Sequence, residues 1–167
     1  RFMSLRDLVI NARSYSRFRE DKDVDLSVLT GIVDTVRFVP SSINMQPLRY
    51  AISVNRDVNA KIFPLLAWAR QLKDWGGPVP GERPAAYIVI AGNDATPERH
   101  LVVDLGIACQ TRVFEVAVVE LVWCMIGNLN AKGVHEISGF PDEFRVLRVM
   151  AVGYAGEKVV IEDLPPG

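Results

Sequence analysis

The sequence is poor in cysteine and histidine, and this scarcity excludes several kinds of site. Its 167 residues include two cysteines, Cys109 and Cys124, and two histidines, His100 and His135. No CxxC spacing or Cys/His cluster occurs, so neither a zinc site nor a disulfide framework is indicated, and we expect no metal. We expect both cysteines to be small core residues. Neither histidine has an obvious catalytic partner in the sequence, so we expect both to belong to the scaffold.

A surplus of charge and a long hydrophobic run are also lacking. The 19 basic and 20 acidic residues give a formal net charge of -1, whereas nucleic-acid binding rewards a basic surplus. The most apolar stretch, residues 113–126, is interrupted by Glu115 and Glu120 and is shorter than the roughly 20 residues that span a bilayer. Charges at Arg1, Arg6 and Asp7 occupy the place of a signal peptide's apolar core. We therefore expect a cytoplasmic protein with a small-molecule partner, and no nucleic-acid or membrane partner.

Common catalytic and nucleotide-binding motifs are absent as well. The sequence has no GxGxxG, Walker-type, HExxH, GxSxG or EF-hand spacing. It does have 49% hydrophobic residues, with 12 glycines and 10 prolines scattered along the chain. This composition predicts one compact domain over residues 1–167 with a substantial core.

Hydrophobic spacing predicts a mixture of helices and strands without strict alternation. Ser4 and Asp7 form a capping-box pattern before a first helix whose apolar face includes Leu5, Leu8, Val9 and Ala12. The other predicted helices are one capped by Asp25 and ending before Pro40, one over 58–66 begun or kinked by Pro64, and a short one over 130–137. A long helix is capped by Thr96, has Pro97 as its first residue and extends to about Val119. The predicted strands are 48–54, a buried central strand over 86–91, 123–126 and 145–152.

Two short segments are candidates for ligand binding. The first turn, residues 13–18, combines two arginines with serine hydroxyls directly after the first helix, a set that can hold a phosphate. A solvated basic loop is the alternative interpretation. The second turn, Pro40 to Pro47, contains serine, asparagine and glutamine between two prolines, so it offers uncharged donors and acceptors suited to a neutral heterocycle. An ordinary Asx-rich turn explains that composition equally well.

Taken together, the two turns resemble the nitroreductase-like family of FMN-dependent, NAD(P)H-oxidising enzymes, whose members carry an RS-containing basic turn and a PSSxNxQP turn. The similarity covers nearly the whole chain and is closest to the short bacterial and archaeal members. Further matching segments are Lys61 to Pro64, Leu66 to Ala69, Leu72 to Trp75, Gly81 to Pro84, Asp104 to Gln110, Cys124 to Gly127 and Lys158 to Asp163.

This resemblance implies an α+β fold, with a mixed, mostly antiparallel sheet flanked by helices, in an intertwined homodimer with FMN at the subunit interface. It places Arg13, Ser14 and Arg17 at the FMN phosphate or flavin edge. It also implies that the flavin ring and ribityl chain are approached by Pro40, Ser41, Ser42 and Asn44 of the other subunit, by Gln110 on the long helix, and by Met125, Ile126 and Gly127 near flavin N5. Trp68 and Trp75 would belong to a lid over the substrate.

The resemblance further implies hydride transfer from NADH or NADPH through flavin N5 to a flat acceptor such as a nitroaromatic or a quinone. No side chain need act as acid or base, because the flavin carries the hydride. The sequence departs from the family pattern at Ser16, where relatives commonly have arginine, and at Glu120, Val122 and Trp123, where relatives usually have glycines. These departures motivate two alternatives, a non-enzymatic flavin-binding or flavin-delivery protein, and an interaction domain without cofactor.

Overall fold

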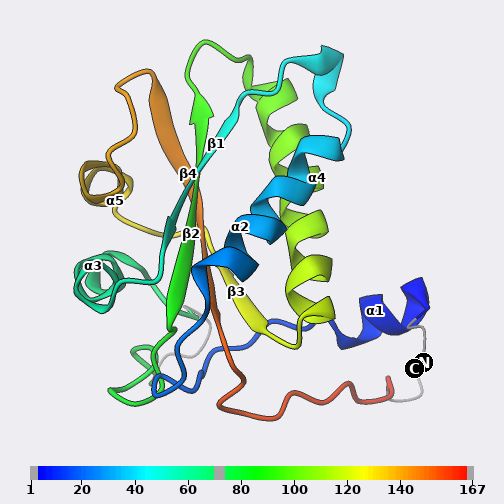
Figure 1. The fold of residues 1–167 in the computed structure, drawn as a ribbon, viewed down its shortest axis with the longest axis vertical. Coiled ribbons are helices and arrows are strands. Elements are labelled where there is room, and N and C mark those ends of the chain that lie inside the picture. The colour runs from blue at the N-terminus through cyan, green and yellow to red at the C-terminus, as the bar shows by residue number, and fades with distance from the viewer. Residues whose placement is uncertain (1–3, 70–73, 165–167) are drawn as a thin grey trace.

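Helices cover both faces of a four-stranded antiparallel sheet in the computed structural model, which describes residues 4–69 and 74–164 (Figure 1). The strand order is β1-β2-β4-β3, and the strands are β1 (Leu48–Ser53), β2 (Ala86–Asn93), β3 (Val122–Ile126) and β4 (Phe144–Gly153). Each neighbouring pair is antiparallel, while an isolated bridge between Ser14 and Trp123 is parallel. The predicted α+β class, with mostly antiparallel pairing, is therefore confirmed.

The helices form two layers. On one face of the sheet lie α3 and α5, and on the other lie α2 and α4, with α1 beyond the C-terminal end of α4 (Figure 1). Their bounds are α1 (Leu5–Asn11), α2 (Leu26–Thr35), α3 (Arg56–Ile62), α4 (Glu98–Val118) and α5 (Ala131–Ser138), with short 3-10 turns η1 (Val36–Phe38), η2 (Ser42–Asn44) and η3 (Phe63–Leu65). The helix predicted over residues 58–66 thus consists of α3 followed by the 3-10 turn that contains Pro64.

Local sequence signals place most helix starts correctly. Both bonds of the Ser4–Asp7 capping box are present, and the Asp25 carboxylate accepts the Ser27 N–H at 2.7 Å. The predicted start of α4 is wrong by one residue. Pro97 is the N-cap, not the first helical residue, because its backbone is extended (ψ 134°). Thr96 is buried in the preceding turn, where its N–H donates to the Asn93 carbonyl.

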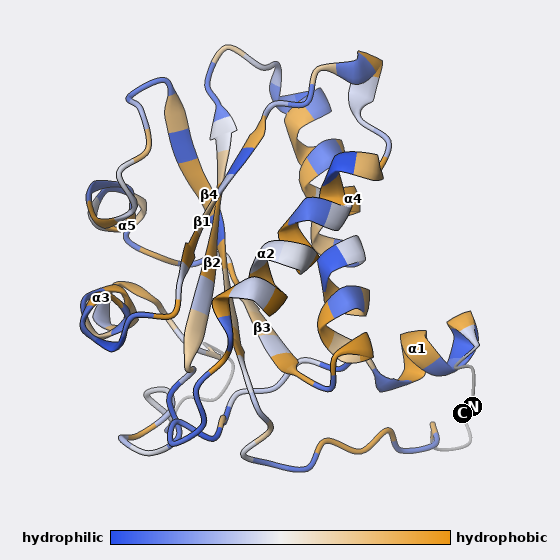
Figure 2. Cartoon of the chain, in the orientation of Figure 1, coloured by the Kyte–Doolittle hydropathy of each residue, from blue (hydrophilic) through white to orange (hydrophobic). Residues whose placement is uncertain are grey.

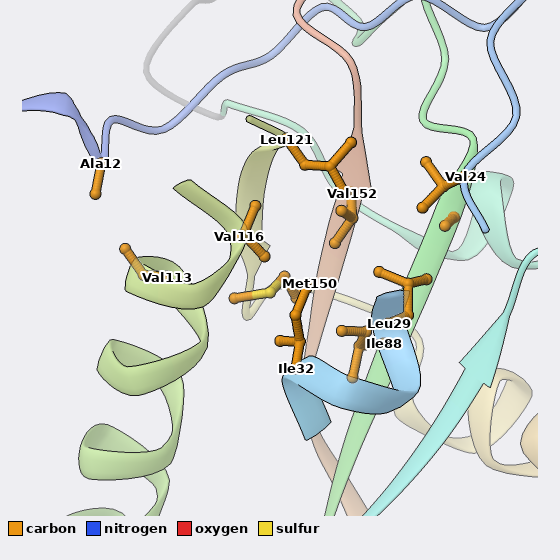
Figure 3. Packing of buried hydrophobic residues seen from close by; sticks show 11 residues of the cluster. Ala12, Val24, Leu29, Ile32, Ile88, Val113, Val116, Leu121, Met150 and Val152 are labelled. Carbon is orange, nitrogen blue, oxygen red and sulfur yellow. The ribbon is translucent and has the colours of Figure 1, made fainter. Parts of the chain in front are cut away.

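The central strand β2 separates two hydrophobic clusters. Residues 86 to 92 are all buried, which confirms a strand covered on both faces. The cluster on the α2/α4 face brings Leu29 and Ile32 of α2 against Val116 of α4 and Met150 of β4 (Figure 3). The opposite cluster packs Tyr87 and Val89 under α3 and α5. The sheet and its covering helices thereby hold the surrounding turns in place.

The first helix forms as predicted, but one chain does not bury its apolar face. No residue of α1 is buried, and Leu5, Val9 and Ile10 have exposed fractions of 69%, 44% and 42%. Figure 2 shows hydrophobic positions on α1, which lies away from the sheet. The apolar spacing therefore formed a helix, but only Ala12, at its C-cap, reaches the core. A single copy of the chain leaves this apolar surface in contact with water.

Within residues 4–69 and 74–164, no helix has the length and apolarity required to cross a bilayer. The same residues contain no group of three or more His, Cys, Asp or Glu side chains placed to hold a metal ion.

Candidate functional site

The first turn, residues 13–18, is held by a carboxylate from the far end of the chain. Oε1 of Glu157 accepts the backbone N–H groups of Ser16 and Arg17 at 2.5 and 2.9 Å. The two segments approach so closely that a Cβ on Gly156 would lie 2.6 Å from the Phe18 carbonyl oxygen, so only glycine fits there. Residues 155–157 therefore shape this turn.

Arg17 is already surrounded by negative charge. Its guanidinium lies 3.2 Å from Glu157 and 3.3 Å from Glu82, and it covers the Trp75 ring at 5.2 Å from the centroid. These contacts connect the first turn to the loop that follows residue 73 and to the C-terminal segment. Because two carboxylates share this one cation, Arg17 has less net charge to offer a phosphate than the sequence suggests.

Arg13 and Ser14 are the remaining polar side chains predicted for an anion. One terminal nitrogen of Arg13 donates to the Val9 carbonyl at 2.5 Å, at the end of α1, while its buried Nε has no hydrogen-bond partner within the described residues. Ser14 is exposed and its backbone bridges to Trp123 on the edge strand β3. Consecutive residues of this turn thus supply a guanidinium with one unpartnered buried nitrogen and an exposed serine, which are donor types that bind phosphate.

The second turn, Pro40 to Pro47, is held by a buried carboxylate of α4. Asp104 is only 3% exposed, and its Oδ2 accepts the Ser41 hydroxyl at 2.5 Å while its Oδ1 accepts the Ser42 N–H at 2.7 Å. The Ser41 oxygen in turn accepts the Gln46 N–H at 2.9 Å. One carboxylate therefore ties both ends of the turn to the helix.

The backbone of the second turn is strained. Ile43, Asn44 and Gln46 have φ angles of 45°, 57° and 50°, in the left-handed region that residues other than glycine seldom adopt. Ile43, Asn44 and Met45 are all exposed, and the Gln46 side-chain amide donates to Asn44 Oδ1 at 2.9 Å. Strained residues of this kind cluster at functional sites, where the surroundings hold them in place.

The second turn also forms one wall of an open cavity of about 550 Å³, which Tyr50 and Asp104 line as well.

The two turns lie at opposite ends of α4 (Figure 1). The second turn is attached at Asp104, whereas α1 and the start of the first turn pack near Val113. Nine residues of helix separate these points, which corresponds to about 14 Å at roughly 1.5 Å per residue. The structure therefore does not bring the two predicted sets of site residues together in one chain.

The residues predicted to lie beside the flavin ring are spread over α4 and the end of β3. Gln110 is exposed on α4. Met125 and Ile126 point to opposite faces of the sheet, as consecutive strand residues must. A Cβ on Gly127 would lie 2.9 Å from the Arg148 guanidinium, which places an exposed cation at the end of this strand. On the α4 side, Met125 contacts Cys109 with the two sulfur atoms 4.0 Å apart.

The two tryptophans predicted to form a lid differ in their surroundings. Trp68 is buried (7% exposed) and packs against the Phe18 and Phe63 rings at centroid distances of 6.5 and 5.9 Å. Trp75 is half-buried beneath Arg17. Leu72 and Lys73, which belong to the family match, lie outside the described residues. A lid role for Trp75 stays a prediction, and Trp68 is placed in the core.

Three charged residues of the site region were missed by sequence reasoning. Glu157 carries no local signal, because its role depends on a contact between the chain's two ends. Asp104 and Arg112 do have a local sequence signal, because both are charged residues on a face of α4 that is otherwise apolar and buried. Arg112 is fully buried 4.3 Å from the Tyr50 ring centroid, and its three nitrogens have no hydrogen-bond partner in the described part of the chain. Burial lowers the pKa of this guanidinium.

Burial also raises the pKa of both cysteine thiols, Cys109 and Cys124. A raised thiol pKa keeps the protonated form at neutral pH, and the protonated form is a poor nucleophile. Both cysteines are free and partly buried. The geometry is therefore that of a binding site, with donors and acceptors and no activated nucleophile among these thiols.

Comparison with known proteins gives consistent matches. A family model described as the nitroreductase family matches residues 9–154. A curated relative from Burkholderia lata, named as a candidate NADH dehydrogenase/NAD(P)H nitroreductase, is 29% identical over 98 residues, which is 59% of this chain but only 46% of the relative. The chain therefore matches less than half the length of that relative.

Solved structures share the fold at low sequence identity. A nitroreductase family protein from Streptococcus pneumoniae superposes with a TM-score of 0.78 at 16% identity, covering 98% of this chain and 96% of that one. A nitroreductase with bound FMN from Desulfitobacterium hafniense gives 0.74 at 20% identity, covering 93% and 92%. These similarities establish the architecture in which the two turns are placed.

Proposed function

This chain belongs to the nitroreductase family, and from that membership we propose that it is an FMN-dependent oxidoreductase. It takes a hydride from NADH or NADPH and delivers it to a flat acceptor such as a nitroaromatic or a quinone. The similarity to a structure with bound FMN supports the choice of cofactor. When bound, FMN supplies the centre that accepts and donates the hydride, and the protein supplies position and electrostatics.

The donor chemistry of the two turns fits the two halves of FMN. Arg13 and Ser14 bind the phosphate, since a guanidinium with an unused buried donor beside a hydroxyl suits a phosphate group. The second turn provides the uncharged groups of Ser42 and Asn44, which match the carbonyl and N–H edges of a flavin ring. Gln110, the Met125 side chain and the backbone at Ile126 and Gly127 form the wall beside the ring, because the Ile126 side chain points to the other face of the sheet. No acid or base is required of any of these residues.

The separation of the turns supports a homodimer as the functional unit. A single chain holds them at opposite ends of α4. In the proposed dimer, a second copy brings its Pro40–Pro47 turn to the first turn of its partner. Exposed apolar residues support this arrangement, with Val102 and Val103 on α4 half-exposed in addition to the apolar surface of α1. Large exposed apolar surfaces mark interaction sites, so these residues are candidates for a surface that a second copy covers.

The proposal that two chains share each FMN site depends on the separation of the two turns, and a mixing experiment tests it. We expect Arg13→Ala and Asn44→Ala homodimers each to bind FMN weakly. Subunit exchange between the two variants creates mixed dimers in which one site carries both substitutions and the other carries neither. The intact site should restore tight FMN binding. A mixture that binds no more FMN than the two variants measured separately would show that both turns do not serve one flavin across two chains.

The Arg13→Ala variant also tests the phosphate role directly. Loss of one charge-assisted bond should weaken FMN binding by about 10- to 100-fold while leaving the oligomeric state unchanged. Arg6→Ala is the matched control, because Arg6 is an exposed arginine on α1 with no ion pair in the described residues. Isothermal titration of the apoprotein with FMN measures both. An unchanged dissociation constant for Arg13→Ala contradicts the assignment, and a purified protein that takes up no FMN contradicts the whole proposal.

A flavin-binding or flavin-delivery protein without enzyme activity is the second candidate function. The observation that favours it is the double ion pair of Arg17, which, together with Ser16, reduces the positive charge available to hold the cofactor. Anaerobic addition of NADH and NADPH separates the two candidates. Bleaching of the flavin absorbance supports the oxidoreductase, whereas bound flavin that stays oxidised supports the carrier.

A further inference from the structure

We infer that Asp104 is a positioning residue of the proposed FMN site, one that fixes the Pro40–Pro47 turn in the shape it presents to the flavin of a second copy. The inference rests on the proposed function. Asp104 itself is 3% exposed beneath the turn, so it acts through the turn and not on the cofactor.

The Asp104 carboxylate is compensated by the turn alone. No Lys, Arg or His side chain of the described residues lies within ion-pair distance of it, so the Ser41 hydroxyl and the Ser42 N–H carry its stabilisation. Hydrogen bonds to an ionised group are shorter and stronger than neutral ones, and the distances of 2.5 and 2.7 Å agree with that. Because a buried charge is costly without such partners, the carboxylate and the turn stabilise each other.

The same bonds hold a strained backbone. Three left-handed residues in one short turn persist only where the surroundings determine their conformation. The Ile43 side chain is 78% exposed, so its own packing contributes little within one chain. The Ser41 hydroxyl meanwhile joins the two ends of the turn, since it donates to Asp104 and accepts from the Gln46 N–H. Without Asp104, this connection to the helix is lost and the strained conformation has no anchor.

The network also divides the polar residues of the turn by role. The Ser41 hydroxyl hydrogen is engaged with Asp104, so Ser41 is an internal residue and not a donor to the flavin. The Ser42 hydroxyl has no hydrogen-bond partner in residues 4–69 and 74–164, and Asn44 is exposed. Ser42 and Asn44 are therefore the flavin-facing residues, and Asp104 and Ser41 hold them in place.

The test compares Asp104→Asn with Glu98→Gln, a carboxylate-to-amide change on the same helix at an exposed position. The first readout needs no cofactor and is hydrogen exchange of the Ser42 and Gln46 amides in the apoprotein. The second is the FMN dissociation constant, and the third is the visible spectrum of the protein saturated with FMN. For Asp104→Asn we expect amide exchange and the dissociation constant each to rise by about tenfold, with a shifted flavin band, and no change for Glu98→Gln.

Two outcomes overturn the inference. One is native amide protection together with native FMN affinity in Asp104→Asn. Another is a lowered melting temperature with an unchanged spectrum of bound flavin, which would make Asp104 a stabilising residue only. If Asp104→Asn does not fold, Ser41→Ala removes one bond and must show the same pattern. A native protein that takes up no FMN refutes the proposed function instead, and in that case the amide exchange still reports whether Asp104 holds the turn.

Discussion

The two turns are held by similar means in different environments. Each is attached through a carboxylate from a distant part of the sequence. Glu157 accepts two backbone N–H groups of the first turn, and Asp104 accepts one backbone N–H and one hydroxyl of the second turn. The Glu157 side chain is 23% exposed, shares Arg17 with Glu82 and lies on the extended C-terminal segment. Asp104 is buried in a 21-residue helix, and no Lys, Arg or His of residues 4–69 and 74–164 lies within ion-pair distance of it. The first attachment is peripheral and the second belongs to the core.

This difference indicates that the first turn is adjustable and the second turn is rigid. Exposed ion pairs are weak and exchange easily, so the first turn can adjust when a phosphate competes for its donors. A buried, charge-assisted network with a strained backbone is rigid, so the second turn keeps its shape before any ligand arrives. Preorganisation of that kind lowers the entropic cost of binding. We expect the two turns to respond differently to substitution.

The largest effect is expected for Asp104→Ala. Removing the carboxylate leaves the partly buried Ser41 hydroxyl and Ser42 N–H without their partner, so the free energy of unfolding should fall by about 3 kcal/mol. Urea denaturation of the apoprotein measures this loss. A loss no larger than that of Glu157→Ala would break the distinction between a core attachment and a peripheral one.

A smaller effect is expected for Glu157→Ala, about 1 kcal/mol, because solvent replaces the carboxylate at a partly exposed site. Salt should mimic part of this change by screening the pairs with Arg17. Hydrogen exchange of the Arg17 amide should therefore accelerate in high salt, while the Ser42 amide serves as the buried control and should not respond. Equal salt sensitivity at the two amides would contradict the comparison.

The smallest effect is expected for Ile43→Gly. Glycine adopts a φ near 45° without steric cost, so relief of strain of about 1–2 kcal/mol outweighs the greater entropy of unfolded glycine. We expect a net gain of about 0.5 kcal/mol in unfolding free energy for the apoprotein. Met45→Gly is the control, because Met45 has an ordinary φ of -70° and should lose stability. Destabilisation by both substitutions would mean that the turn is not strained in solution.

Local patterns predicted the elements of this fold well. The continuous apolar run of β2 identified the central strand, and the capping residues Ser4 and Asp25 marked two helix starts. These signals succeed because capping bonds and side-chain periodicity depend on residues a few positions apart. The error at the start of α4 is also local, because it concerns the backbone conformation of one residue, Pro97.

Packing was harder to predict. The apolar spacing of α1 predicted a helix with one apolar face, and a single chain leaves that face exposed. Trp68, which was predicted to belong to a lid, is buried in the core. Apolar periodicity predicts that a helix has an apolar face, but it does not show whether the same chain or a second chain buries that face. The roles of Glu157 and Asp104 were missed for a related reason, since each binds a turn 60 or more residues away in the sequence.

The α+β class, the order of the elements and the two polar turns can be predicted from the amino-acid sequence, because all of these depend on short-range patterns and on motifs shared with a family. The folded structure was needed to show that Arg17 is neutralised by two carboxylates, that Asp104 holds a strained turn, and that the two turns lie at opposite ends of α4. These properties depend on contacts between residues far apart in the chain, whose geometry exists only after the sheet and helices have packed.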